Sequence, residues 1–106
     1  MIKVMNRYYI EVEDRELCRQ RDVSIEEYLI ATFSSDIADV DADFACDVAL
    51  LAMKAELHCE DADETGQGLD EWAVWLEVAN KDIKRCEQLV TALIDFTHTS
   101  DWVIVK

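Results

Sequence analysis

The sequence predicts an α+β fold, a small single-domain sandwich in which helices pack on an antiparallel sheet. Three observations lead to this prediction. The chain has 106 residues, 51% of them apolar, which is enough for one core in one domain spanning residues 1–106. Some segments alternate apolar and polar residues as strands do, and others repeat apolar residues at helical spacing. Proline is absent and glycine occurs twice, so long regular elements should predominate.

The first predicted element is a strand over residues 2–12. β-branched and aromatic residues are frequent there, and Val4, Tyr8 and Ile10 share one face of the strand. Asn6 is the one polar residue at an inner-face position. The charged residues 13–21 that follow predict a turn or a short helix.

Two helices are predicted next. Ser24 with Glu27 three residues later forms a capping box, which opens a helix that we expect to end near Phe33, where two serines follow. The alternating aspartates of residues 39–43 can then cap a second helix that begins near Phe44. Their charge would lie at a helix N-terminus, which the macrodipole favours by a few tenths to about 1 kcal/mol for each carboxylate.

A hairpin is predicted in the second half of the chain. Residues 53–60 alternate in polarity, as do residues 71–79, and the loop 61–68 between them contains both glycines. A rival reading remains open, because the apolar residues over 69–97 also fit the 3-4 spacing of one long helix. We favour the hairpin because tryptophan and valine prefer strands.

The chain closes with a helix and a strand. Asn80 is a plausible cap for a helix over residues 81–97, in which Phe96 is among the expected buried residues, and a short strand follows over 101–106. The resulting order is β-α(α)-β-β-α-β, the layout of a ferredoxin-like sandwich. The alternative is a mainly helical protein with a long 69–97 helix and terminal strands.

The charge is concentrated in one part of the chain. The formal net charge is −14, and residues 22–80 contain sixteen acids against one base, Lys54. Such a field selects which partners approach and how fast, but it encodes neither a fold nor a reaction. It should repel nucleic acid and anionic membranes, so we expect direct binding to neither.

No pattern for catalysis or metal binding is visible. The chain has no P-loop, G-x-G-x-x-G, G-x-S-x-G or H-E-x-x-H sequence, and residues 39–50 lack the glycine and glutamate of a calcium loop. His58 and Cys59 are adjacent, so on a strand they would lie on opposite faces and would not share a zinc ion. We therefore expect a protein that is not an enzyme and has no cofactor and no metal site.

The expected compartment is the cytoplasm. The N-terminus lacks the apolar region of a signal peptide, and no apolar run approaches the roughly 20 residues that span a bilayer. The four cysteines, at positions 18, 46, 59 and 86, form no C-x-x-C pair, so we expect buried reduced thiols.

These observations favour a small acidic binding protein that occupies the basic, nucleic-acid-binding surface of another protein. In size and charge alone, the chain resembles the small phage proteins that block restriction or CRISPR complexes, and the immunity proteins of nuclease toxins. The alternative is an acidic structural or assembly module that forms a homo-oligomer.

The candidate partner-binding residues are two acidic runs and one tryptophan. Trp72 and Trp75 would lie on opposite faces of a strand, so one can fill the core while the other emerges as an anchor. The candidates are Asp36, Asp39, Asp41, Asp43, Asp47, Glu60, Asp61, Asp63, Glu64, Asp70, Glu71 and Trp75.

Overall fold

A computed structural model describes residues 1–44, 53–58 and 70–106 of the chain. The strands are β1 (Ile2–Ile10), β2 (Met53–His58), β3 (Asp70–Val78) and β4 (Val103–Val105). The helices are α1 (Val12–Arg21), α2 (Ile25–Val40), α3 (Ala42–Phe44), the 3-10 turn η2 (Asn80–Asp82) and α4 (Ile83–Thr97). The predicted α+β class and the β-α(α)-β-β-α-β order are confirmed, with the second helix of the first crossover only three residues long in the described chain.

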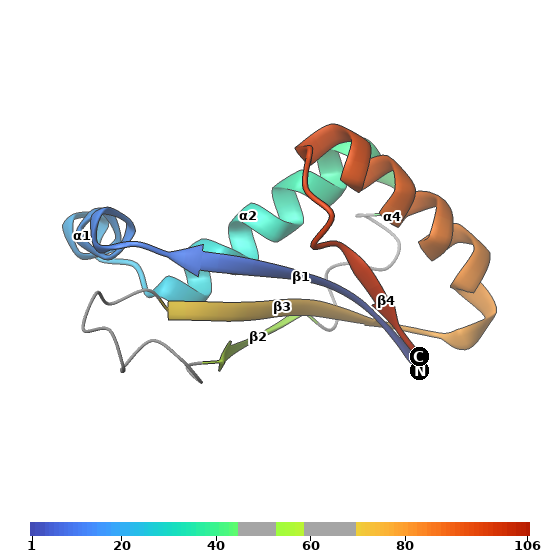
Figure 1. The fold of residues 1–106 in the computed structure, drawn as a ribbon, viewed down its shortest axis with the longest axis horizontal. Helices are drawn as coiled ribbons and strands as arrows, with labels where there is room; N and C mark the ends of the chain where they lie inside the picture. The colour runs from blue at the N-terminus through green and yellow to red at the C-terminus, as the bar shows by residue number, and fades with distance from the viewer. Residues whose placement is uncertain (45–52, 59–69) are drawn as a thin grey trace.

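The four strands form one antiparallel sheet in the order β2-β3-β1-β4. Figure 1 shows α2 and α4 side by side on one face of this sheet, α1 beyond the end of β1, and the two chain termini next to each other. We call the face under α2 and α4 the helix-covered face and the opposite face the outer face. Because side chains alternate along a strand, each strand contributes to both faces.

The core lies between the helix-covered face and the helices. Val4 and Ile10 of β1 and the alternate residues Val74, Leu76 and Val78 of β3 are all buried there. The strand reading of residues 71–79 is therefore confirmed, since β3 pairs with all nine residues of β1. The rival long helix is excluded because residues 70–78, its first third, pair with β1 as a strand instead.

Helix α2 is longer than the sequence predicts. Its capping box is confirmed: the Glu27 amide donates to Ser24 Oγ at 3.1 Å, and the Ser24 amide donates to Glu27 Oε2 at 3.4 Å. The expected end near Phe33 is wrong, because the helix continues to Val40. Phe33 and Ile37, one turn apart, are completely buried, and this burial outweighs the weak helix propensity of the two serines between them.

Of the two alternatives predicted for residues 13–21, the helix is confirmed, with a capping box of Glu11 and Asp14. Two smaller expectations need correction. Asn80 does not cap α4, because it begins η2 and the residue before α4 is Asp82. Phe96 is 51% exposed rather than buried, since it lies in the last turn of α4 on the side away from the sheet core.

Candidate binding surface

Four of the predicted partner-binding acids follow one another at the end of α2 and in α3. We call Asp36, Asp39, Asp41 and Asp43 the α2–α3 acidic segment. Asp39 and Asp43 are exposed, whereas Asp36 and Asp41 are half-buried. Asp41 follows the last residue of α2, and its Oδ1 accepts a hydrogen bond of 2.9 Å from the Phe44 amide, which stabilises the turn into α3.

The extension of α2 reverses the electrostatic setting of these acids. The sequence places them at a helix N-terminus, but Asp39 lies in the last turn of α2 and Asp36 one turn before it. The C-terminal end of a helix carries partial negative charge, so each carboxylate there is disfavoured by a few tenths to about 1 kcal/mol. Glu26 and Glu27, by contrast, lie in the first turn, where the macrodipole favours them.

No base balances the segment locally. Residues 22–44 contain no lysine or arginine, and in the described ranges no ion pair involves any of the four aspartates. On α4, the guanidinium of Arg85 lies 5.1 Å from the centre of the Phe44 ring, next to the end of the segment.

Burial, with a smaller contribution from negative charge, raises two pKa values at this end of α2. Burial raises the pKa of Asp36, and the negative charge of Asp39 raises it further. Burial likewise raises the pKa of Tyr8 on β1 to about 12; the nearby Asn6 amide opposes this shift, and the charge of Asp36 adds to it. Asp36 therefore lies close to the phenol of β1, at the boundary between the helix layer and the sheet.

Five of the predicted partner-binding acids lie outside the described residues. They are Asp47 of the first acidic run and Glu60, Asp61, Asp63 and Glu64 of the second. Asp70 begins β3 and pairs with Ile10 of β1. Glu71 lies on the outer face, where its Oε1 accepts from Arg7 Nη1 at 3.2 Å.

Trp75 differs from the expectation of an emerging anchor. It lies on the outer face as β3 alternation requires, but only 9% of it is exposed, nearly the same as the 8% of Trp72 on the helix-covered face. The ammonium of Lys3 lies 4.9 Å from the centre of the Trp75 ring. The candidate residues are thus divided: the α2–α3 acidic segment belongs to the helix layer, and Glu71 and Trp75 lie on the opposite face of the sheet.

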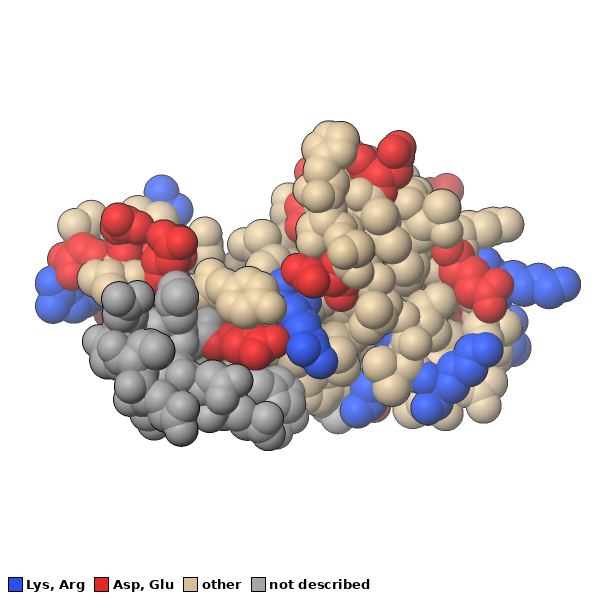
Figure 2. Space-filling model, in the orientation of Figure 1, with Lys and Arg blue, Asp and Glu red and all other residues tan. Residues whose placement is uncertain are grey.

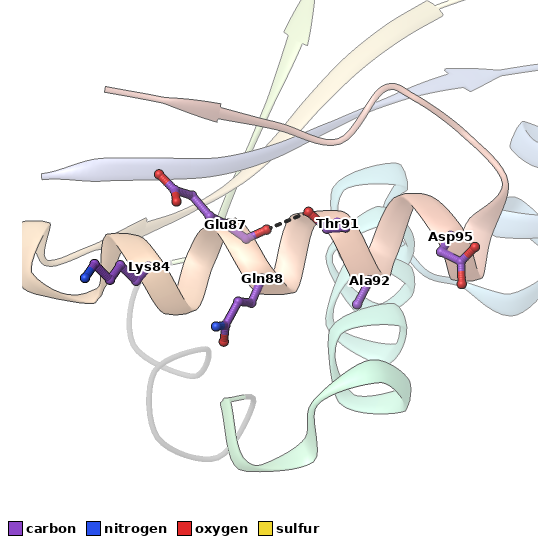
Figure 3. A pocket seen from close by; sticks show the side chains of 6 residues that line it. All are labelled: Lys84, Glu87, Gln88, Thr91, Ala92 and Asp95. Atoms are coloured by element: carbon purple, nitrogen blue, oxygen red, sulfur yellow. Dashed lines mark hydrogen bonds between the residues drawn. The ribbon is translucent and has the colours of Figure 1, made fainter.

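The charged side chains are unevenly spread over the face shown in Figure 2. Acidic side chains gather over α1 at one end, and basic side chains gather at the end where the chain termini lie. A hollow of about 770 Å³ lies along α4, lined by side chains of both signs (Figure 3). Its lining residues are Lys84, Glu87, Gln88, Thr91, Ala92 and Asp95.

Three buried polar side chains lie together on the helix-covered face of β1 and β3, and the sequence pattern did not predict a function for them. Asn6 is 4% exposed, and neither its Oδ1 nor the Tyr8 hydroxyl nor Trp72 Nε1 makes a hydrogen bond of acceptable geometry. All three residues occupy inner positions of β1 and β3. The only sequence signal for this cluster was the polar Asn6 at an apolar position of the alternation.

The thiol expectation is confirmed for the two cysteines that can be assessed. Cys18 and Cys86 are buried and free, and burial raises the pKa of Cys86; Cys46 and Cys59 lie outside the described residues. Across residues 1–44, 53–58 and 70–106, no three His, Cys, Asp or Glu side chains come together as a metal site. None of the described helices has the length and apolar content to cross a bilayer.

Comparison with known protein families, with characterised proteins and with solved structures finds no match to this chain.

Proposed function

We propose that the protein is a small, non-catalytic inhibitor or nucleic-acid mimic. Its α2–α3 acidic segment would occupy the basic, nucleic-acid-binding surface of another protein, as anti-restriction, anti-CRISPR or nuclease-immunity proteins do. The single observation that carries the proposal is the placement of this segment: four carboxylates that form no ion pair with the rest of the described chain, two of them against the dipole of α2.

The spacing of the carboxylates supports the mimicry. An α-helix rises about 1.5 Å per residue, so Asp36 and Asp39 of α2 are separated by about 4.5 Å along the axis, and Asp41 and Asp43 follow at the turn into α3. One strand of B-DNA carries a phosphate charge every roughly 3.4 Å. A basic groove that accepts a nucleic-acid backbone would therefore meet a similar linear charge density on this segment.

The cost of this arrangement in the free protein also supports a binding role. Burial and the charge of Asp39 raise the pKa of Asp36, and both carboxylates oppose the dipole of α2, so their ionised forms destabilise the fold. A partner arginine or lysine would relieve that repulsion in the complex. Residues that conflict with local stability in this way are expected at functional sites.

The test measures DNA cleavage by purified basic nucleases, namely restriction endonucleases, CRISPR nucleases and nuclease toxins, with increasing amounts of the protein. We expect inhibition of a susceptible nuclease at about 50 mM salt that weakens steeply at about 500 mM salt, because ions screen the attraction. Asp39→Lys combined with Asp43→Lys should weaken inhibition about tenfold or more. Both residues are exposed, and Asp41 is left in place because it stabilises the turn into α3.

The matched control combines Glu26→Lys with Glu87→Lys. It changes the net charge by the same amount at exposed positions, at the other end of α2 and on α4. It should retain most of the inhibition if the α2–α3 acidic segment is the site. Equal loss in both variants would indicate a diffuse field, and full inhibition by the Asp39 and Asp43 variant would exclude the segment. If no nuclease is bound at any salt concentration, the acidic assembly module takes the place of the inhibitor.

A further inference from the structure

One edge of the sheet is open beside the short strand β4. β4 pairs only with residues 3–5 of β1, so no described strand pairs with residues 7–10 on this side, although β3 pairs with all of β1 on the other. In an antiparallel sheet, every second residue directs its N–H and C=O groups toward the same neighbouring strand. Residues 7–10 therefore present backbone donors and acceptors at the spacing that another strand fits.

The exposure of β1 changes where β4 ends. Lys3 and Met5, which pair with β4, are half-buried, whereas Arg7 and Tyr9 on the same side of β1 are exposed, Tyr9 by 58%. In Figure 2 the surface dips between the α1 end and the α4 end of the molecule, where β1 runs in Figure 1. Another chain can therefore reach this part of β1.

The connection between α4 and β4 explains why β4 does not cover this edge. In the register of β4, residues 98–101 would have to lie opposite residues 7–10. They turn back to the end of α4 instead, where His98 has the left-handed conformation, with φ 57°. Trp102 Nε1 donates to Thr97 Oγ1 at 3.0 Å, which ties the residue before β4 to the last residue of α4.

Negative charge gathers at the α1 end of this edge. Glu11 follows β1 directly, and Glu13 and Asp14 lie in the first turn of α1. The pKa of Glu11 is raised mainly by a hydrogen bond with Glu13 and by the negative charge of Glu13, and the charge of Asp14 adds to this shift. Two bases of β1 and α1 are already engaged, since Arg7 is in an ion pair and Arg15 has an interaction of its own. A cation from outside the chain would therefore relieve the repulsion among these carboxylates.

We propose that this edge binds a basic, extended peptide segment of a partner protein, which adds to the sheet as a strand in line with β4. The segment would supply the backbone donors and acceptors that residues 7–10 lack. If it runs antiparallel to β1, as β4 does, its N-terminal end lies at the α1 end of the edge. A lysine or arginine there can pair with the carboxylates of Glu11 and Glu13. The exposed ring of Tyr9 can contact a side chain on the outer face of the added strand.

Charge favours such a segment over a second copy of this chain, and the length of the edge limits its affinity. A second copy has a formal charge of −14, which the carboxylates at the α1 end repel. Four residues of a strand span about 13 Å and make about four interstrand hydrogen bonds. For a short peptide we therefore expect a dissociation constant of about 0.1 to 1 mM.

The experiment titrates the ¹⁵N-labelled protein with a peptide of about six residues that alternates lysine and valine, with both ends blocked. We expect chemical-shift changes and slower amide exchange within residues 7–10. The same peptide with two adjacent central amides N-methylated has the same charge but cannot donate to β1 in either register, so it should bind about tenfold or more weakly. A peptide with glutamate in place of lysine should bind at least as weakly as the methylated one.

Glu13→Lys should weaken binding of the lysine peptide about threefold, because it reverses one charge at the end of the edge. The matched control is Glu87→Lys at an exposed position of α4, which should bind as the wild type does.

Three results would overturn the proposal, and the first two need no variant to fold. Equal binding of the methylated peptide would exclude strand addition, and shifts outside residues 7–10 alone, or no binding up to about 5 mM, would exclude this edge. Equal binding of the glutamate peptide, or of the lysine peptide by folded Glu13→Lys, would exclude a basic occupant. None of these substitutions touches the α2–α3 acidic segment, so the inhibitor proposal stands or fails separately.

Discussion

The two faces of this sheet are built from the same strands and differ in almost every physical property. The helix-covered face is apolar and is packed under α2 and α4, and buried polar atoms of Asn6, Tyr8 and Trp72 make no hydrogen bond of acceptable geometry within the described chain. The outer face carries paired charges, with Arg7 bonded to Glu71 and Lys3 placed over Trp75. Stability should therefore depend mainly on the first face.

Trp72 and Trp75 show this difference within one strand. They are almost equally buried, at 8% and 9% exposure. Trp72 belongs to the core cluster under the helices, whereas Trp75 is covered on the outer face, where a lysine ammonium contacts its ring. The two tryptophans are thus equally buried for different reasons, and mutations on the two faces should differ in their effect on stability.

The largest expected effect is the loss of a core aromatic ring. Phe33 of α2 is completely buried and stacks on Trp102, with ring centroids 5.2 Å apart. We expect Phe33→Ala to lower the free energy of unfolding by about 3 to 5 kcal/mol, because it removes apolar contacts and leaves a cavity. Tyr9→Ala on the outer face is the matched control and should lower it by less than about 1 kcal/mol. Urea denaturation at low protein concentration measures both, and similar losses would contradict the contrast between the faces.

A smaller effect of opposite sign is expected at Asn6. Its side chain is 4% exposed and its Oδ1 has no hydrogen-bond partner, so burial of this polar group opposes folding. Asn6→Val should raise the free energy of unfolding by about 1 kcal/mol, since valine suits the strand and contains no polar atom. Asn6→Ala, which also removes packing volume, should not show this gain. A loss of stability in the valine variant would show that the amide of Asn6 contributes to the native fold.

The smallest effect concerns Asp36 in the α2–α3 acidic segment. Because burial and Asp39 raise the pKa of Asp36 in the folded state, the folded protein binds a proton there more readily than the unfolded chain. Stability should therefore fall as the pH rises through the titration of this carboxyl. Asp36→Asn should stabilise the protein at neutral pH by about 0.3 to 1 kcal/mol, nearer the lower value because water screens the partly exposed charge.

Urea denaturation at several pH values tests the Asp36 prediction. The advantage of the asparagine variant should shrink as the pH falls and Asp36 of the wild type becomes protonated. Glu26→Gln is the control, because the Glu26 carboxylate lies in the first turn of α2, where the dipole favours it. It should give no stabilisation at neutral pH. A gain for Asp36→Asn that does not change with pH would mean that the raised pKa is not its cause.

Much of the local structure could be predicted from the sequence, because its signals act between near neighbours. The alternation of β1 and the Ser24–Glu27 capping box depend on residues only two or three positions apart, and both are confirmed. The concentration of negative charge is likewise a property of composition alone. The element order followed from these local signals, and the α+β class followed from that order.

Only the tertiary structure decided the remaining features, because each depends on contacts between distant residues. Residues 71–79 fit a strand and a helix equally in spacing, and pairing with β1 selected the strand. The serines after Phe33 favoured a helix end, but burial of Phe33 and Ile37 against the sheet extended α2 to Val40. That extension moved Asp36 and Asp39 to the disfavoured end of a helix, and strand alternation placed Glu71 on the opposite face beside Arg7. The free energy of burying apolar surface between elements exceeds the local preferences of a few residues, so packing rather than local sequence determined where these charges lie.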